Sequence, residues 1–142
     1  MSLYRTNARL ALQKWGHVSR QCLRELKALT EQHRVSVGAA HVVLLEGKWY
    51  VTHAGLLAIA RRHRCCGIYT EPATEFCQQP ASKWTFKATV YTCRASRGFV
   101  GFGDADPSNV SPVVLGAEMR VAETRAVNRA LRKAYGIGIC SV

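Results

Sequence analysis

Three arginines are regularly spaced in the last third of the chain. Arg125, Arg129 and Arg132 follow one another at intervals of four and three residues, which places them in one stripe along a helix. Neighbours in such a stripe lie about 5 to 6 Å apart, close to the distance between successive phosphates of an extended strand. A guanidinium binds phosphate through two parallel hydrogen bonds. The stripe, with Lys133 beside it, therefore predicts a surface that holds a phosphate backbone.

The same stripe also fits a solvated helix face that Glu118 and Glu123 partly neutralise. The overall charge favours the binding surface. The chain has 20 Lys and Arg against 9 Asp and Glu, a net charge of +11 and a pI near 9.9, and 14 of the 20 basic residues are arginine. Such an excess favours polyanionic partners, above all nucleic acid, with an anionic membrane surface as the alternative.

Two further groups of basic residues lie near tyrosines and are weaker candidates for the same site. They are Arg61, Arg62 and Arg64 before Tyr69, and Lys83, Lys87 and Arg94 around Tyr91. Basic grooves with interspersed rings hold single strands without sequence preference. Each group taken alone fits a plain surface, so their accumulation carries the prediction.

Four carboxylates offer a different chemistry, that of a metal-dependent nuclease. They are Asp104, Asp106, Glu118 and Glu123. The segment from Asp104 to Asn109 also has ordinary turn composition, in which short side chains bond to nearby amides. We therefore expect turn and capping roles for these acids.

The glycines from Gly98 to Gly103 do not match a nucleotide-binding loop. Their order is Gly-x-x-Gly-x-Gly, and no βαβ unit surrounds them. Glycine inside a strand instead indicates a bulge or a close backbone approach. His63-Arg-Cys-Cys66 with Cys77 matches no common zinc spacing. We expect no cofactor.

The elements that position these residues follow from periodicity and turn signals. The expected order is a helix over 4–33 that Gly16 interrupts, a hairpin over 41–45 and 48–52, a helix over 53–64, strands over 67–76, 84–94 and 99–103, and a long helix over 113–135. Strands grouped before a helix imply an α+β fold, with an antiparallel sheet packed against the C-terminal helix. We expect one domain over 1–142, in which residues 1–34 are a helical segment before the core.

Alternation and helical spacing also predict which faces are buried. In the strand over 84–94, Trp84, Phe86, Ala88 and Val90 point one way. On the last helix, the expected packing face is a sector that Val127, Leu131 and Ala134 continue, and its centre is formed by Leu115, Met119, Ala122, Ala126 and Ala130. The small alanines allow a close approach to the sheet or to a neighbouring subunit.

The sequence carries no sign of a membrane or secretory segment. No apolar run approaches the roughly 18 to 20 residues of a membrane span, and Arg5, Arg9 and Lys14 interrupt the N-terminus. We expect a cytoplasmic protein whose six cysteines are reduced thiols.

A family likeness covers roughly residues 41–140. Gly-Phe-Gly-Asp-Ala-Asp-Pro-Ser-Asn-Val, then Ala122-Glu-Thr-Arg-Ala-Val-Asn-Arg-Ala-Leu-Arg132 and Gly136-Ile-Gly-Ile-Cys140, resemble the DNA single-strand annealing superfamily of the Rad-fifty-two type. The closer likeness is to its bacterial and phage branch, which includes the DdrA-like repair proteins. Lys48-Trp-Tyr-Val-Thr-His-Ala-Gly-Leu-Leu57 resembles the hairpin and helix before the family's meander.

The resemblance implies a homo-oligomeric ring or filament that holds single-stranded DNA in a basic groove and anneals complementary strands without ATP. It assigns groove positions to Arg129 and Arg132, and Asn128 stands where eukaryotic members have a further lysine. It also implies a recombinase or single-strand-binding protein as partner. The segment up to Arg34 has no counterpart. The chain ends at Val142 without the tail by which relatives recruit partners, which fits a minimal form or a fragment.

The expected function is therefore non-enzymatic binding and annealing of single-stranded DNA in recombination or repair. Two alternatives stay open. One is the metal-dependent nuclease, and the other is a module for duplex DNA or RNA.

Overall fold

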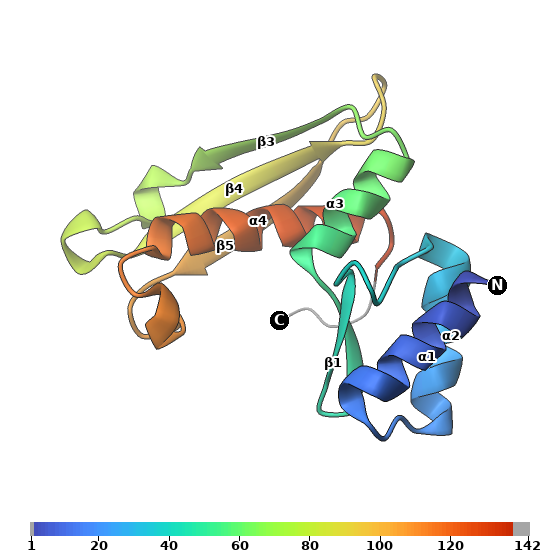
Figure 1. Ribbon diagram of the computed structural model, residues 1–142. Coiled ribbons are helices and arrows are strands. Elements are labelled where there is room, and N and C mark those ends of the chain that lie inside the picture. Colours follow the sequence, from blue (N-terminus) through green and yellow to red (C-terminus); the bar gives the residue numbers. More distant parts are fainter. Residues whose placement is uncertain (1, 138–142) are drawn as a thin grey trace. The chain divides into compact units, whose positions relative to one another are not determined.

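The computed structural model describes residues 2–137 (Figure 1). Chain contacts divide the chain into two compact units, one that runs to Arg62 and one that begins at His63. The hairpin and the short helix were expected to form one core with the later sheet, whereas the contacts group them with the N-terminal helices. Each unit is described by itself.

The first unit contains three helices and a two-stranded antiparallel sheet. The elements are α1 (Leu3–Trp15), α2 (Arg20–His33), β1 (Val42–Leu45), β2 (Lys48–Val51) and α3 (His53–Arg62). The N-terminal segment is thus two helices rather than one. Gly16 ends α1 with a φ of 73° and donates its N–H to the carbonyl of Leu12, and Ser19 caps the start of α2.

A buried asparagine ties α1 to the rest of the first unit. The side-chain amide of Asn7 donates to Thr30 Oγ1 at 3.0 Å and to the carbonyl of Val35 at 2.8 Å, and its Oδ1 accepts the Val37 N–H at 2.9 Å. Asn7 is fully buried, so these bonds satisfy groups that water cannot reach. The sequence pattern alone did not reveal this role, because the partners lie more than twenty residues away.

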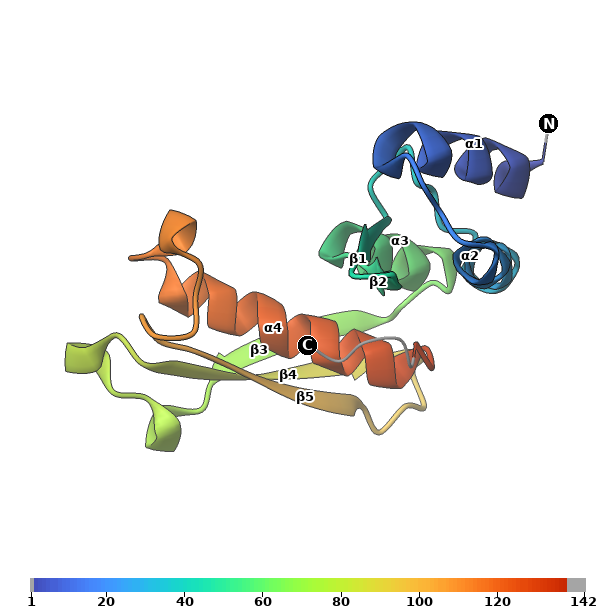
Figure 2. The same ribbon diagram turned by 90° about the horizontal axis from the view of Figure 1, so that it is seen from below.

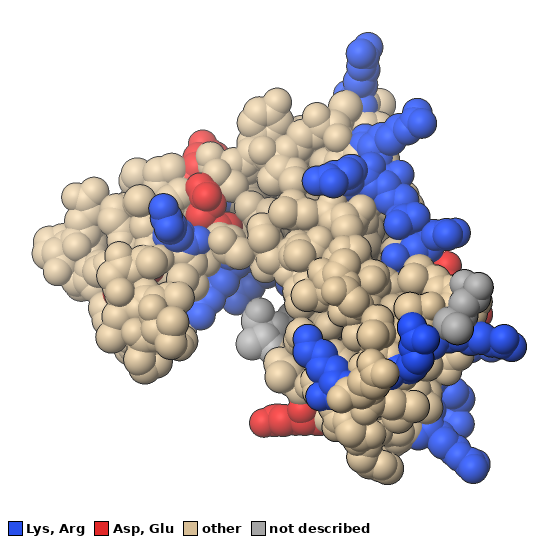
Figure 3. All heavy atoms as spheres, viewed as in Figure 1, with Lys and Arg blue, Asp and Glu red and all other residues tan. Residues whose placement is uncertain are grey.

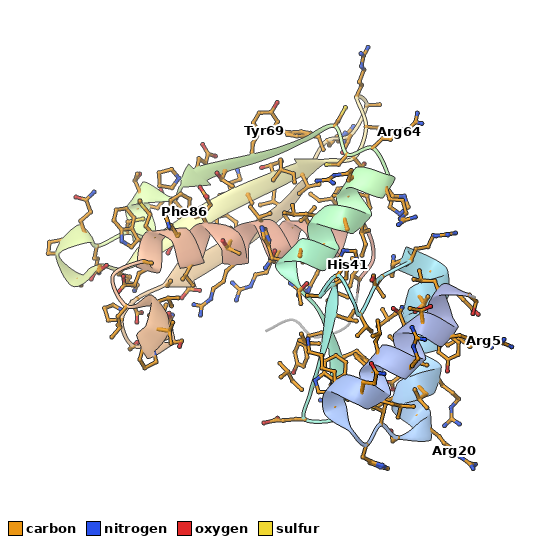
Figure 4. The ribbon with its side chains drawn as sticks, viewed as in Figure 1. Arg5, Arg20, His41, Arg64, Tyr69 and Phe86 are labelled. Carbon is orange, nitrogen blue, oxygen red and sulfur yellow. The ribbon has the colours of Figure 1, made fainter. Side chains whose placement is uncertain are left out.

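His41, which comes just before β1 (Figure 4), is a titratable side chain whose pKa bears on the stability of the first unit. Its Nδ1 accepts the N–H of Ser36 at 3.1 Å, and partial burial, with Arg62 second, lowers the pKa of His41 below its usual 6.5. The unfolded chain therefore takes up this proton at higher pH than the folded chain. The contribution of neutral His41 to the free energy of unfolding is complete above pH 6.5 and is lost as the pH falls through the pKa of the folded state.

We expect chemical denaturation to give a lower free energy of unfolding at about pH 5.5 than at about pH 7. His41→Asn keeps a side-chain acceptor but does not titrate, so its loss of stability on acidification should be smaller than that of the wild type. An equal loss in both proteins would assign the effect to other groups.

The second unit is a three-stranded antiparallel sheet with a helix across one face (Figure 2). Its strands β3 (Gly67–Pro72), β4 (Trp84–Tyr91) and β5 (Phe99–Ala105) are ordered β3-β4-β5, and α4 (Glu118–Ala134) packs against them. Short 3₁₀ turns, η1 (Thr74–Phe76), η2 (Gln79–Ala81) and η3 (Pro112–Val114), occupy the connections. The expected α+β class, with antiparallel sheets and a packed C-terminal helix, is confirmed.

The start of α4 was predicted incorrectly. Pro112 opens the turn η3, and Gly116 has a φ of 92°, so the helix begins at Glu118 rather than near residue 113. Leu115 therefore lies outside the helix and is 57% exposed, and Met119 is 48% exposed. Neither residue belongs to the packing face.

Glycines on β5 allow α4 to pack directly on the sheet backbone. A Cβ on Gly101 would lie 2.4 Å from the backbone nitrogen of Ala130, and one on Gly103 would lie 2.2 Å from that of Ala126. The expected close approach is confirmed. The β4 side chains alternate as expected, with Phe86, Ala88 and Val90 buried and Trp84 half-buried.

Candidate nucleic-acid interface

A row of cations from α4 lies along the outer edge of β5. Among residues 2–137, β5 pairs with no strand other than β4, and three of its carbonyls accept hydrogen bonds from helix side chains. Arg125 donates to the carbonyl of Asp104 at 2.8 Å, Arg129 to that of Phe102 at 2.7 Å and Lys133 to that of Val100 at 2.7 Å. We call Arg125, Arg129 and Lys133 the cation row.

The side chains of α4 reach the carbonyls of β5 because the helix and the strand advance by similar distances. Every second residue of a strand advances about 6.6 Å, and every fourth residue of a helix advances about 6 Å. Arg132 was expected in the stripe, but Lys133 continues the interval of four along β5. Arg132 lies one residue away and is half-buried.

Contacts with β5 leave donors on the cation row for a ligand. Arg125 is held most firmly, with further hydrogen bonds to Asn109 Oδ1 at 3.0 Å and to the Asn109 carbonyl at 2.8 Å. The Arg129 side chain is 40% exposed and its NH1 lies 3.9 Å from the Asp104 carboxylate. A guanidinium has five N–H donors and an ammonium has three, so Arg129 and Lys133 can bind phosphate while they hold β5.

The sheet face away from α4 carries exposed aromatic rings. In the pairing of β3 with β4, Tyr69 lies opposite Thr89 and Glu71 lies opposite Lys87. In the pairing of β4 with β5, Lys87 lies opposite Phe102. Directly paired residues share a face. Tyr69 is 65% exposed and Phe102 is 48% exposed, and Figure 4 shows Tyr69 projecting from β3. We call this surface the open face.

A pocket lies on the open face beside the ends of β3 and β4. Its volume is about 420 Å³ and it is lined by Cys66, Gly67, Tyr69, Tyr91, Cys93 and Arg94. The rings of Tyr69 and Tyr91 meet edge to face, with centroids 5.6 Å apart. We call it the tyrosine pocket. The sequence analysis noted both tyrosines but placed them in separate groups.

The other predicted binding residues are distributed over both units. Arg61 and Arg62 end α3 in the first unit. Arg64 follows in the second unit with a φ of 55°. Lys83 lines a second pocket together with Thr85 and Asp104. Lys87 lies on the open face and Arg94 lines the tyrosine pocket.

The excess of basic residues is unevenly divided between the two units. Residues 1–62 contain ten Lys and Arg against three acids, a net +7, and residues 63–142 contain ten against six, a net +4. Figure 3 shows many basic side chains and few acidic ones on one face of the molecule. The segment up to Arg34, which has no counterpart in the family likeness, has seven Lys and Arg against two Glu, a net +5.

The four candidate carboxylates have separate surroundings. Asp106 accepts hydrogen bonds from the Ser108 hydroxyl and N–H, which lower the pKa of this carboxyl. Glu123 accepts from Thr70 Oγ1 at 3.1 Å. Glu118 is 3% exposed, and its Oε2 has no hydrogen-bond partner within the described chain. Among residues 2–137, no group of three or more His, Cys, Asp or Glu is arranged to hold a metal ion.

Glu118 does not lie where the alternative interpretation of the arginine stripe puts it. That interpretation places Glu118 on a solvated helix face, where it would partly neutralise the arginines. Glu118 is instead buried in the first turn of α4, so its carboxylate is not part of a solvated face beside the cation row. Asp104 is the acid that lies against the row, at 3.9 Å from Arg129.

No helix in the described part of the chain is long and apolar enough to cross a membrane. No family model, curated protein or solved structure gives a significant match to this chain.

Proposed function

We propose that this protein binds single-stranded DNA without sequence preference and anneals complementary strands in recombination or repair, without ATP. The observation that carries the proposal is the cation row on an exposed sheet edge. Its repeat of about 6 Å follows from the helix, and such a repeat suits successive phosphates of an extended strand.

The neighbourhood of the row supports single-stranded rather than duplex DNA. Phe102 gives its carbonyl to Arg129 and exposes its ring on the open face. A strand whose phosphates lie on the row can therefore place bases over this ring. Stacking engages the flat face of a base and leaves its pairing edge available, which annealing requires. A rigid duplex offers no unstacked bases to such a surface.

The family likeness adds the remaining parts of the proposal. It supports assembly into a homo-oligomeric ring or filament and a recombinase or single-strand-binding protein as partner. We place the protein in the cytoplasm, where the five described cysteines, all free thiols, stay reduced.

The proposal is tested with a labelled oligo-dT strand in a salt series, by fluorescence anisotropy. We expect affinity to fall as salt rises, with a slope of about −0.7 for each phosphate neutralised. Unlabelled duplex and RNA should compete less well than single-stranded DNA. A preference for duplex would instead support the general nucleic-acid module.

Two further measurements separate annealing from other outcomes. Complementary strands labelled with a donor and an acceptor dye should pair faster with the protein than without it. Light scattering should show an oligomer on the DNA, whereas a monomer in both states would contradict the annealing model. Cut strands after incubation with Mg²⁺ or Mn²⁺ would show a nuclease instead.

A further inference from the structure

The tyrosine pocket lies outside the cation row and has its own construction. Tyr69 is on β3 and Tyr91 ends β4, and the register pairs Gly67 with Tyr91. The N–H of Cys66 donates to the carbonyl of Tyr91 at 2.8 Å, which continues the pairing beyond the strand. The floor of the pocket is therefore hydrogen-bonded sheet.

Two glycines give the rings their positions. A Cβ on Gly67 would lie 2.8 Å from Cε2 of Tyr69, and a Cβ on Gly98 would lie 3.1 Å from Cε1 of Tyr91. Each ring thus lies against backbone that a larger residue would cover. The rings meet at an interplanar angle of 77°, a favourable edge-to-face arrangement. This packing fixes an aromatic pair while Tyr69 remains 65% exposed.

The rim of the pocket selects for an anionic aromatic ligand. Arg94 is exposed at the rim, and no acidic residue is among the residues that line the pocket. A flat ring can stack on Tyr69 and a phosphate can bind Arg94, and a nucleotide has both groups. Cross-strand pairing also places Tyr69 on the same face as Lys87 and Phe102, so a strand bound along the open face can reach the pocket.

We propose that the tyrosine pocket holds one unpaired nucleobase of the bound strand, stacked on Tyr69 with an adjacent phosphate at Arg94. This inference rests on the proposed function, since it adds a base contact to a site otherwise described by its phosphate contacts. The stacked base is held by its face, so any base fits. Its contribution does not depend on salt.

The first test compares oligo-dT with an abasic oligonucleotide of the same length. Tyr69→Ala should weaken binding of oligo-dT by about tenfold, leave the abasic strand unchanged and preserve the salt slope. Tyr69→Phe keeps the ring and should bind like the wild type. Phe76→Ala is the matched control, because Phe76 is 56% exposed in the same unit but does not line the pocket.

The second test needs no substitution. Cys66 and Cys93 are exposed thiols that line the pocket, so iodoacetamide modification, located by peptide mass, reports whether it is occupied. Oligo-dT should slow modification of both thiols more than the abasic strand does, at equal saturation. Equal protection by the two strands would overturn the proposal.

The outcomes distinguish this inference from the function on which it rests. Salt-dependent binding of both strands, with no selective effect of Tyr69→Ala on oligo-dT, would overturn the base site and leave the cation row intact. Failure of both strands to bind would overturn the proposed function itself.

Discussion

Replacing the cation row with glutamine, as Arg125→Gln, Arg129→Gln and Lys133→Gln in one protein, should weaken single-strand binding by about a hundredfold at physiological salt. Each substitution removes a positive charge from the edge of β5, where the three side chains donate to successive outward carbonyls. The salt slope should fall by about 2, because about 0.7 is lost for each phosphate contact removed. Anisotropy titrations at several salt concentrations measure both quantities.

Glutamine is chosen because it keeps an N–H donor and a high helix propensity. The cation row also holds β5, so the variant should melt at a somewhat lower temperature while its circular dichroism spectrum remains that of the folded protein. A variant that unfolds at the assay temperature would be replaced by the single change Arg129→Gln, for which we expect about a tenfold loss.

The matched control removes the same charge elsewhere. Arg9→Gln, Arg20→Gln and Lys48→Gln take two arginines and one lysine from exposed positions of the first unit. Since they lower the net charge equally, they measure the general electrostatic contribution. A control that loses as much affinity as the row variant would show that the row is not the interface.

The parts of this fold that follow from local periodicity could be predicted from the sequence. Alternation along β4 identified Phe86, Ala88 and Val90 as buried. The glycines of β5 indicated a bulge or a close backbone approach, and the second is what Gly101 and Gly103 provide. These signals depend on neighbours within a few residues. The sequence of three strands and a final helix along the chain could be predicted from the same local signals.

The features that depend on how two elements register against each other could not be predicted. Lys133 rather than Arg132 continues the cation row because every fourth residue of α4 meets every second carbonyl of β5. Helical spacing alone is compatible with either residue. The tyrosine pocket requires the pairing of Gly67 with Tyr91, since a slip of one residue would move Tyr69 to the opposite face. The burial of Glu118 was not predicted, and α4 was expected to begin several residues earlier than it does.

The contact between α4 and β5 gives the largest expected effect on stability. Gly103→Ala should lower the free energy of unfolding by about 3 kcal/mol or more, because the new Cβ would lie 2.2 Å from the backbone nitrogen of Ala126 and 2.5 Å from the carbonyl oxygen of Ala122. Backbone atoms cannot rotate away as a side chain does. The helix must move off β5, and the cation row moves with it.

Two companion variants identify the cause of this loss. Gly38→Ala should cost little, because its Cβ would approach movable side chains, Leu10 Cδ1 at 3.2 Å and Ser36 Oγ at 3.7 Å. Adding Ala126→Gly to Gly103→Ala should not restore stability, because the clash is with the Ala126 backbone and trimming its side chain leaves that backbone in place. Thermal and urea unfolding measure both comparisons. Recovery in the double variant would mean that side-chain crowding, rather than backbone contact, sets the distance between α4 and the sheet.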